Sequence, residues 1–577
     1  MNAHGTEAQY VYAPHRRKSA TGRAERADVI TTQIMRNALN SAANQMKRVL
    51  IRTSFSPVIY EAMDFAVALY DREIRMLAQA PTLPAFMGTM SFCVEAAVER
   101  VGGETTLEPG DIILFNLPFG TGSHAQDMAV VMPVFRREDL VGYATSKGHL
   151  TDIGAKAPYG TDTTDLFQEG VVFPGVKLYR RGELVEDIFK MLLANSRAPN
   201  AVKGDILAEV ACVRAGAAEL LRVIERFGLQ AFHDCTERMY EYGEAVVRDF
   251  ISRIPDGRYT GAGHLDDDGL VDNAIRFEVE LLVEGEEITF DLSRVPDATK
   301  GPVNSPFPST VSACRIVLAM LAGNEAPNEG HFRPLKVISR PGSMFHPVAP
   351  QPTFLYGWSF TQLMEALFEA FAAALPGQVP SGSAGDLCGV MFWRFDEERQ
   401  ETMVAACPQP VGLGALPKGD GATMFIPPLA QSTLPSAELQ ETKWPFMQID
   451  RWDFATDSAG PGQFRGGVGW HLHYRLLRDV SMLTGIERTK VPSWGQAGGL
   501  SGVANRALLR YPDGRVTAIK KVTGLELPTG TVVEVLCGGG GGYGEPSKRD
   551  PADVHRDIRL GYTSEEKSRE HYPHAFT

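Results

Sequence analysis

Two histidines and an aspartate stand close together in the sequence, around two short apolar segments. His124 and Asp127 occur in the stretch Gly-Thr-Gly-Ser-His-Ala-Gln-Asp at residues 120–127, and His149 lies downstream. Imidazole nitrogens and a carboxylate form a ligand set suited to Zn, Mn or Fe, with coordination positions left open for water or substrate. These three residues are therefore candidate metal ligands.

The segments between the candidate ligands predict how the chain brings them together. Residues 129–135 and 141–146 read as two strands, and a polar turn joins them. In a hairpin closed by that turn, residues whose numbers add to about 275 face each other across the ladder. Asp127 and His149 satisfy this relation, because their numbers add to 276. His124 would lie a short step away, in the preceding loop.

Simpler interpretations of these residues stay open. A His three residues from an Asp often occurs by chance, and a register shift of one residue would turn His149 to the opposite face. Asp64, at the start of the apolar segment 64–70, is a candidate base or an outer partner of a metal-bound histidine, or else a solubilising charge at a strand edge. His471 and His473 alternate in a predicted strand and form a second metal candidate, with packing as the simpler role.

The glycine-rich stretches lack a nucleotide-binding signature. Residues 538–542 are all glycine, without the Lys-Ser/Thr ending of a phosphate-binding loop, and no Gly-x-Gly-x-x-Gly fingerprint joins a strand to a helix. The run predicts a close-packing turn or, alternatively, a flexible lid over a ligand. No Gly-x-Ser-x-Gly nucleophile motif is present, and Cys93 lies in an apolar helical pattern typical of core residues.

Length and composition indicate a multidomain globular protein. The chain has 577 residues, too many for one hydrophobic core, and its 44% hydrophobic and 22% charged residues are ordinary for globular proteins. A net charge of −13 without a long basic stripe argues against nucleic-acid binding. No apolar run approaches the ~20 residues of a membrane span, no signal core is seen, and the scattered cysteines fit a reducing compartment. We therefore predict a cytoplasmic protein without a membrane segment.

The order of the predicted elements is that of a multidomain α/β (mixed α+β) protein. Asp28 and Asp205 are the expected starts of two of its helices. Helical patterns cover residues 28–51, 85–101, 204–228, 231–254, 309–323 and 359–374, and strands dominate 258–292. From about residue 385 to 545 the pattern turns to strands and turns rich in Gly and Pro, and one short helix is expected after residue 551.

Composition shifts divide the chain into five expected parts. The first is a basic arm whose charges lie within residues 15–26, and which is either flexible or in contact with an acidic partner surface. The five parts are the flexible arm (1–27), a metal-binding α/β domain (28–255), an α+β middle domain (256–384), a β-rich Gly/Pro-rich domain (385–550) and a polar tail (551–577).

Several separate motifs resemble those of the hydantoinase B/oxoprolinase family. The resemblance covers nearly the whole chain, and it is specific because many motifs occur together. It is carried by residues 64–71 (Asp-Phe-Ala-Val-Ala-Leu-Tyr-Asp), 109–111, 116–124 with Asp127, 148–154, 167–170, 301–304, 328–334, 457–460, 464–467 and 543–546. The departures are Ser123, where the family often has Thr, and Ala125-Gln126, where it often has Leu-Pro; neither removes a candidate ligand.

The resemblance implies a fold like that of hydantoinase B proteins and a role for each candidate residue. Related carboxylases and ATP-dependent cyclic-amide hydrolases hold a divalent metal through a His, an Asp and a second His in this arrangement. By that similarity His124, Asp127 and His149 bind one ion, Zn first with Mn or Fe as alternatives, and Asp64 is the base or an outer partner. ATP and Mg belong to a hydantoinase A-like partner subunit, and an α2β2 heterotetramer is expected.

The resemblance also implies a reaction, in two versions that use the same ligands. In the first, the partner phosphorylates the oxygen of a cyclic amide (a hydantoin, 5-oxoproline or a lactam), and metal-bound water attacks the activated carbon. In the second, an ATP-dependent ketone carboxylase of the acetone/acetophenone type, the metal stabilises an enolate-like oxygen while CO2 from bicarbonate is captured. We favour the hydrolase, because carboxylase subunits tend to be longer and to accompany a third small subunit. A non-catalytic scaffold with a structural metal is a further alternative, although such sites usually have four protein ligands.

Overall fold

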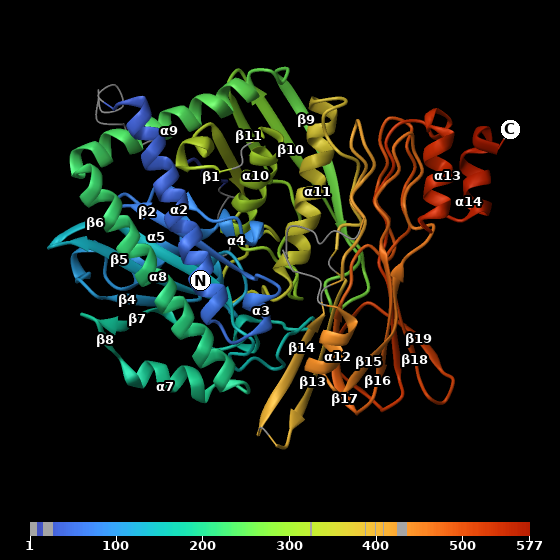
Figure 1. The fold of residues 1–577 in the computed structure, drawn as a ribbon, viewed down its shortest axis with the longest axis horizontal. Helices are drawn as coiled ribbons and strands as arrows, with labels where there is room; N and C mark the ends of the chain where they lie inside the picture. The colour runs from blue at the N-terminus through green and yellow to red at the C-terminus, as the bar shows by residue number, and fades with distance from the viewer. Residues whose placement is uncertain are drawn as a thin grey trace, which may run out of the picture.

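Four hydrogen-bonded sheets and the helices between them make up the described part of the chain (Figure 1). The computed structural model describes residues 9–14, 27–323, 326–386, 388–398, 400–407, 409–423 and 436–576. The predicted mixed α/β fold with a β-rich C-terminal part is confirmed. The charges of the predicted basic arm, at residues 15–26, lie outside the described residues, and the predicted domain boundaries stay predictions. Among the described helices, none combines the length and apolar character that a membrane crossing requires.

A seven-stranded antiparallel sheet carries the candidate ligands. In order across the sheet, its strands are β3 (Met76–Gln79), β2 (Phe65–Asp71), β6 (Asp139–His149), β5 (Asp127–Arg136), β4 (Ile112–Phe115), β7 (Pro174–Arg180) and β8 (Glu183–Leu184). Both faces are covered, since alternate residues of β2 belong to two different hydrophobic cores. This double burial explains why β2 reads as a continuous apolar run rather than an alternating one.

Helices pack on each face of this sheet. On one face α2 (Val29–Thr53) and α8 (Pro199–Phe227) lie against each other, and α9 (Leu229–Ile251) follows α8. The carboxylate of Asp28 accepts a hydrogen bond from the Thr31 backbone N–H at 2.7 Å and so caps α2, as predicted. The other face packs against α4 (Pro84–Met87) and α5 (Met90–Arg100). The short helices α3 (Pro57–Tyr60), α6 (Pro118–Thr121) and α7 (Glu186–Ala194) lie in the connections.

A second sheet shares the core of α4 and α5. Its strands, in order, are β1 (Tyr10–Tyr12), β12 (Leu335–Ser339), β11 (Glu287–Asp291), β10 (Ile275–Glu284) and β9 (Gly257–Leu265). Phe277, Val279 and Leu281 of β10 are buried while their neighbours are more exposed, which confirms the alternation seen in the sequence. Between the two sheets lie α10 (Phe307–Leu321), against α4, and α11 (Tyr356–Ala374), against β9.

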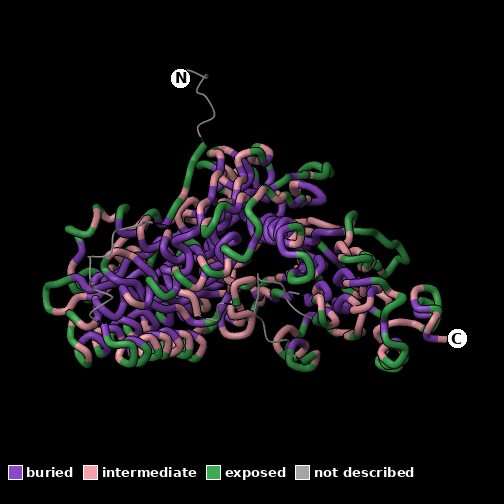
Figure 2. Tube along the Cα trace, turned by 90° about the horizontal axis from the view of Figure 1, so that it is seen from above, coloured by how far each residue is buried: buried purple, intermediate pink, exposed green. Residues whose placement is uncertain are grey.

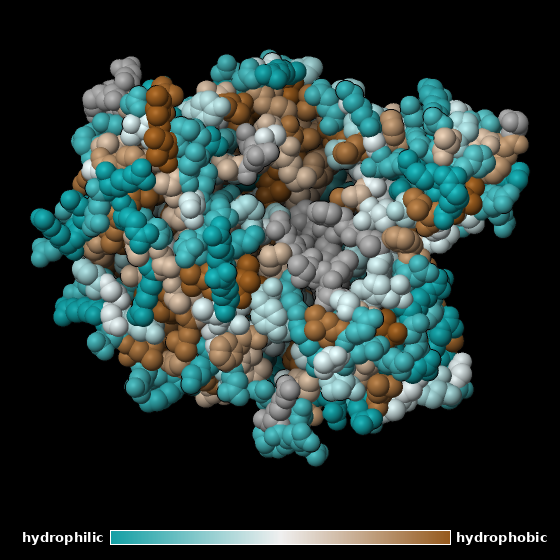
Figure 3. Space-filling view, viewed as in Figure 1, coloured by the Kyte–Doolittle hydropathy of each residue, from teal (hydrophilic) through white to brown (hydrophobic). Residues whose placement is uncertain are grey.

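The C-terminal part holds two antiparallel sheets around a third core (Figure 1). One sheet has the order β14 (Glu401–Cys407), β13 (Gly389–Asp396), β17 (Val480–Gly485) and β20 (Lys521–Leu527). The other has the order β15 (Met447–Phe454), β16 (Trp470–Leu476), β21 (Val532–Leu536), β18 (Arg506–Arg510) and β19 (Val516–Ile519). One helix, α12 (Ala437–Lys443), precedes β15. Buried residues run through both halves of the molecule (Figure 2), and hydrophilic side chains cover much of the face in Figure 3.

Three boundaries differ from prediction. Helix α8 starts at Pro199, which suits a first helical turn, and Asp205 lies inside it, buried, with its carboxylate accepting the backbone N–H groups of Phe55 and Ser56. The predicted helix 85–101 is two helices, α4 and α5, separated at Gly88. The tail has two helices rather than one, α13 (Pro551–Arg559) and α14 (Glu565–His571), because Asp550 and Ser564 each cap one.

Short 3-10 helices cover Glu104–Thr106, Leu166–Gln168, Glu329–Phe332, Pro546–Lys548 and Pro573–Phe576.

The glycine run 538–542 is a buried packing element between loops of the C-terminal part. The Gly541 N–H donates to the carbonyl of Gly382 at 2.8 Å. A Cβ built on Gly540 would lie 1.8 Å from the carbonyl oxygen of Leu413, and one on Gly541 would lie 2.0 Å from that of Trp494. Neither position has room for a side chain, so the run agrees with the close-packing interpretation and not with a lid.

Candidate metal centre

The β5–β6 hairpin places Asp127 and His149 as the sequence predicted. The two residues are direct partners across the ladder. On its other edge β6 pairs with β2, with Gly148 opposite Phe65. The register on which the position of His149 depends is therefore fixed from both sides of the strand.

His124 comes from the loop that follows α6. The Asn116 side chain holds this loop by donating to the carbonyls of Ala125 at 2.7 Å and Val171 at 2.9 Å. Gly122 ends α6 with φ +81°, a left-handed conformation that favours glycine. The loop turns there and brings His124 to the start of β5.

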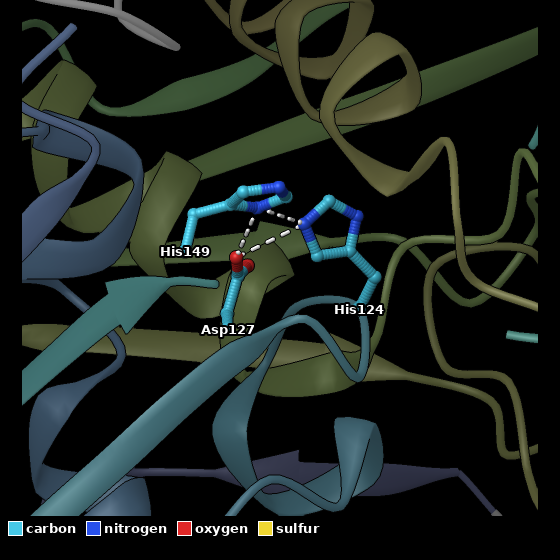
Figure 4. A group of neighbouring side chains, drawn as sticks. All are labelled: His124, Asp127 and His149. Atoms are coloured by element: carbon cyan, nitrogen blue, oxygen red, sulfur yellow. Dashed lines mark hydrogen bonds and ion pairs between the residues drawn. The ribbon is translucent and has the colours of Figure 1, made fainter. Parts of the chain in front are cut away.

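The three candidate ligands converge on one point (Figure 4). His124 Nε2 lies 3.0 Å from Asp127 Oδ1 and 3.0 Å from His149 Nδ1, and the last two atoms are 2.9 Å apart. The donor atoms thus form a nearly equilateral triangle. All three residues are buried, with exposed fractions of 4%, 0% and 6%.

The donor chemistry of this triangle fits a divalent metal. His124 Nδ1 lies 2.9 Å from the carbonyl oxygen of Phe354, and because a carbonyl can only accept, Nδ1 carries the proton. A neutral imidazole then directs its Nε2 lone pair toward the Asp127 carboxylate, so the contact is favourable only with a cation between the two atoms, either a metal ion or a proton on Nε2. The three donor atoms lie 2.9 to 3.0 Å from one another, close enough for one divalent ion to bind all three.

Asp127 and Asp64 lie in different electrostatic settings. Burial alone would raise the pKa of Asp127, but the charge of His124 and hydrogen bonds with both imidazoles outweigh it and hold that pKa well below its usual range. Asp64 Oδ2 lies 4.0 Å from His149 Nδ1, and its side chain is 25% exposed. Loss of hydration raises the pKa of the Asp64 carboxyl to about 7, although the nearby charge of His149 acts to lower this pKa. Asp64 therefore borders the triangle and is not one of its corners.

A cavity of about 140 Å³ opens beside the triangle. Asp64, His124 and His149 line it together with aromatic and aliphatic side chains. Trp358 of α11 and Met391 of β13 are among them, so the middle segment and the C-terminal sheets both contribute walls. Two of the three candidate ligands, His124 and His149, are thus buried in protein yet face an open space.

Sequence reasoning missed the aromatic residues around His124. The Tyr159 hydroxyl donates to the carbonyl of Phe354 at 3.1 Å, and the Tyr356 hydroxyl lies 3.5 Å from Asp127 Oδ2. Both tyrosine rings lie 5.2 Å from the His124 ring, measured between centroids. The available signal was the run Phe-Leu-Tyr-Gly-Trp at residues 354–358, whose three aromatic residues precede the predicted helix 359–374.

Glu169 fixes the segment that orients His124. Its carboxylate accepts the backbone N–H groups of Thr353 at 2.8 Å and Phe354 at 2.9 Å, and the Thr163 hydroxyl at 2.8 Å. Burial raises the pKa of Glu169 to about 7, although these hydrogen bonds oppose the increase. The sequence showed Glu169 only as part of a family motif; the structure shows that it positions the carbonyl to which His124 donates.

A second cluster of ligand types lies on the C-terminal sheet. The Nε2 atoms of His471 and His473 are 3.2 Å apart, and Glu534 Oε1 lies 3.2 Å from His471 Nε2. The Arg510 guanidinium already donates to Glu534, with Nε at 2.9 Å from Oε2. Because an arginine balances the carboxylate and would repel a cation, this cluster fits the packing interpretation rather than a second metal site.

Comparison with known proteins places the chain in a family. The profile of the family described as hydantoinase B/oxoprolinase matches residues 28–546. The chain belongs to the hydantoinase B/oxoprolinase family. It is 29% identical to the B component of a putative D-/L-hydantoinase from Pseudomonas sp. (strain NS671), over 94% of each chain. It is 31% identical to the beta chain of the caprolactamase of Pseudomonas jessenii, over 94% of this chain and 96% of that one.

Two solved structures have the same fold as this chain. The crystal structure of the ATP-dependent caprolactamase from Pseudomonas jessenii matches with a TM-score of 0.87 at 28% identity, covering 95% of this chain and 96% of the other. A nucleotide-free acetone carboxylase matches with a TM-score of 0.85 over 96% of this chain and 80% of the other. Its identity is 18%, so this second likeness concerns the fold alone. The resemblance and the hydantoinase B-like fold predicted from the sequence are confirmed.

Loss of a ligand imidazole is expected to remove the bound metal. His124→Ala should retain less than about a tenth of the divalent ion held by the unmodified protein, because two remaining ligands bind weakly. His471→Ala, a histidine from the second cluster, is the matched control and should keep its metal. Inductively coupled plasma mass spectrometry after dialysis measures both, and full metal content in His124→Ala would contradict the assignment of the ligands.

Replacing Glu169 is expected to weaken metal binding without touching a ligand. In Glu169→Gln, the amide NH2 would oppose the N–H groups of Thr353 and Phe354, so the carbonyl facing His124 would shift and metal affinity should fall by about 10- to 100-fold. Competition with a chelating dye gives the affinity. Glu365→Gln is the control, since this buried carboxylate instead accepts from Ser383. Equal losses of metal affinity in both variants would show that Glu169→Gln weakens metal binding only by destabilising the fold.

Proposed function

We propose that this chain is the metal-binding subunit of a heteromeric, ATP-dependent hydrolase of cyclic amides. The observation that carries the proposal is the buried triangle of His124, Asp127 and His149 at the edge of a cavity, with Asp64 beside it. Relatives of matching length support it, because they are named as subunits of a hydantoinase and a caprolactamase. The metal is proposed to be zinc, with manganese and iron as alternatives.

The names of the relatives also support a partner subunit. We infer that a hydantoinase A-like partner holds ATP and Mg and phosphorylates the amide oxygen, in an α2β2 heterotetramer. In a longer relative, the 5-oxoprolinase of Dictyostelium discoideum, the match to this chain covers 40% of the length. The cysteines are free and buried, which suits a reducing cytoplasm.

The side chains of the cavity have distinct proposed tasks. A divalent metal in the triangle would supply Lewis acidity and lower the pKa of water. Asp64, at the open side, would accept a proton at Oδ2 from the attacking water. Tyr159 and Trp358 limit the space next to His124 and keep bulk water from the activated carbon. Cleavage of the C–N bond would then open the ring with a proton going to the nitrogen, and hydrolysis of the remaining acyl phosphate would release the carboxylate and phosphate.

A reaction panel tests the proposed function. The chain, co-expressed with its hydantoinase A-like partner, receives ATP with hydantoins, lactams and 5-oxoproline, or with acetone and acetophenone plus labelled bicarbonate. Mass spectrometry should detect ring-opened amino acids and no labelled keto acid. A labelled keto acid would make the chain part of a ketone carboxylase. Turnover that persists in His124→Ala would support a structural metal in a non-catalytic scaffold.

Asp64→Asn separates proton transfer from metal binding. The variant should keep its metal, because Asp64 is not a corner of the triangle, and should lose at least about 100-fold in kcat, because an amide cannot accept the proton. Metal content and single-turnover ring opening are measured on the same preparation. Unchanged turnover would exclude the base role, and loss of metal together with turnover would instead make Asp64 a ligand.

A further inference from the structure

A second cavity adjoins the cavity beside the triangle. Its volume of about 180 Å³ exceeds the ~150 Å³ of apolar cavities that hold one benzene ring. His149, a corner of the triangle, faces both spaces. The residues that line both cavities are Val58, Ala62, His149, Met391, Ala406 and Cys407. A small ring that carries one substituent can therefore occupy the second cavity and adjoin the candidate metal centre.

Lys443 is the only lysine or arginine among the described residues that line either cavity. It is the last residue of α12, and its side chain is 24% exposed. The ammonium group forms an ion pair with the Glu61 carboxylate and lies 5.2 Å from the centroid of the Tyr60 ring. These contacts hold a half-buried positive charge at the wall of the second cavity.

The ion pair with Glu61 places Lys443 close to the junction of the two cavities. Glu61 is followed by Ala62, which lines both cavities, and it precedes Asp64 by three residues. Three residues of chain span at most about 11 Å. A ligand held by Lys443 is therefore close to the space that Asp64 and His149 border.

Two carboxylates also line the second cavity, and they differ in position. Glu401 begins β14 and accepts a hydrogen bond from Asn200 Nδ2 at 3.3 Å, whereas Cys407, which lines both cavities, ends that strand. The extended strand separates its two ends by about 20 Å. Of the two acids, Glu61 is thus the one that competes with another anion for Lys443.

We propose that Lys443 binds the phosphoryl group of the activated substrate in the second cavity. The inference rests on the proposed function, in which an anionic phosphorylated amide has to reach the triangle. A phosphoryl group carries up to two negative charges and three strong acceptor oxygens, so it can displace the single charge of Glu61 from the ammonium. Because Glu61 competes for the same ammonium, the phosphoryl group is held weakly, and the substrate can move on to the metal centre.

Isothermal titration calorimetry of the full chain with inorganic phosphate tests this assignment. Lys443→Gln should weaken phosphate binding by at least about tenfold, because a charge-assisted hydrogen bond is lost. Lys443→Arg should retain the binding, and Glu61→Gln should strengthen it, because the competing carboxylate is removed. Lys156→Gln is the matched control and should bind phosphate as the unmodified chain does, since Lys156 pairs with Asp162 and lines neither cavity.

The proposed metal is a second candidate for binding phosphate, and the same titration measures its contribution separately. In His124→Ala, which should hold little metal, phosphate binding should persist and should still depend on Lys443. Binding that disappears in His124→Ala and survives in Lys443→Gln would place the phosphate on the metal and overturn the inference. A titration that detects no phosphate binding to the unmodified chain would overturn it as well.

Turnover by the assembled complex tests the part that Lys443 takes in the reaction. Lys443→Gln should keep its metal and its ATP consumption but yield at least about tenfold less ring-opened product per ATP, because phosphorylated substrate is lost before it reaches the triangle. Lys443→Arg should restore the yield, and an unchanged yield in Lys443→Gln would contradict the inference. If the unmodified complex opens no ring, the proposed function fails, whereas the phosphate titration still decides the assignment of Lys443.

Discussion

The candidate metal centre depends on one register, that of β5 against β6. Asp127 and His149 are cross-strand partners at the end of a hairpin whose second strand is also bonded to β2. Because side chains alternate along a strand, a shift of one residue would turn His149 away and leave two donors where three now meet. Central placement in a sheet with both faces covered makes such a shift costly, since every apolar side chain of β6 would change its core as well.

The third donor is fixed over a much longer distance in sequence. His124 is oriented by the carbonyl of Phe354, and that peptide is held in turn by the carboxylate of Glu169. The 3-10 helix Leu166–Gln168, the Glu169 that follows it and the segment just before α11 must therefore all be in place for the imidazole to present Nε2 to Asp127. An outer partner that selects the tautomer of a ligand histidine also raises its basicity as a donor. Here the partner is a backbone carbonyl, which cannot take up the proton itself.

Local patterns predicted the hairpin, and the family motifs predicted the ligand set, but neither identified the walls of the cavity. The turn sets a pair sum of 275, as for Arg136 and Asp139, and a register shift between Val134 and Phe135 raises the sum to 276 and so places Asp127 opposite His149. Tyr159, Phe354 and Trp358 escaped detection because their contacts with the site depend on how α11 packs between two sheets, which no local period encodes. Asp205 was misread for a related reason: an acidic residue near a helix start resembles a cap, whereas here a distant turn uses its carboxylate.

The triangle and the walls of the adjacent cavity come from different parts of the fold. The triangle is built by the seven-stranded sheet and fixed by residues 353–354, whereas Val390, Met391 and Leu483 come from β13 and β17 of the C-terminal part. Substitutions on these strands can therefore change the size or polarity of the cavity while the spacing of the donor atoms stays the same.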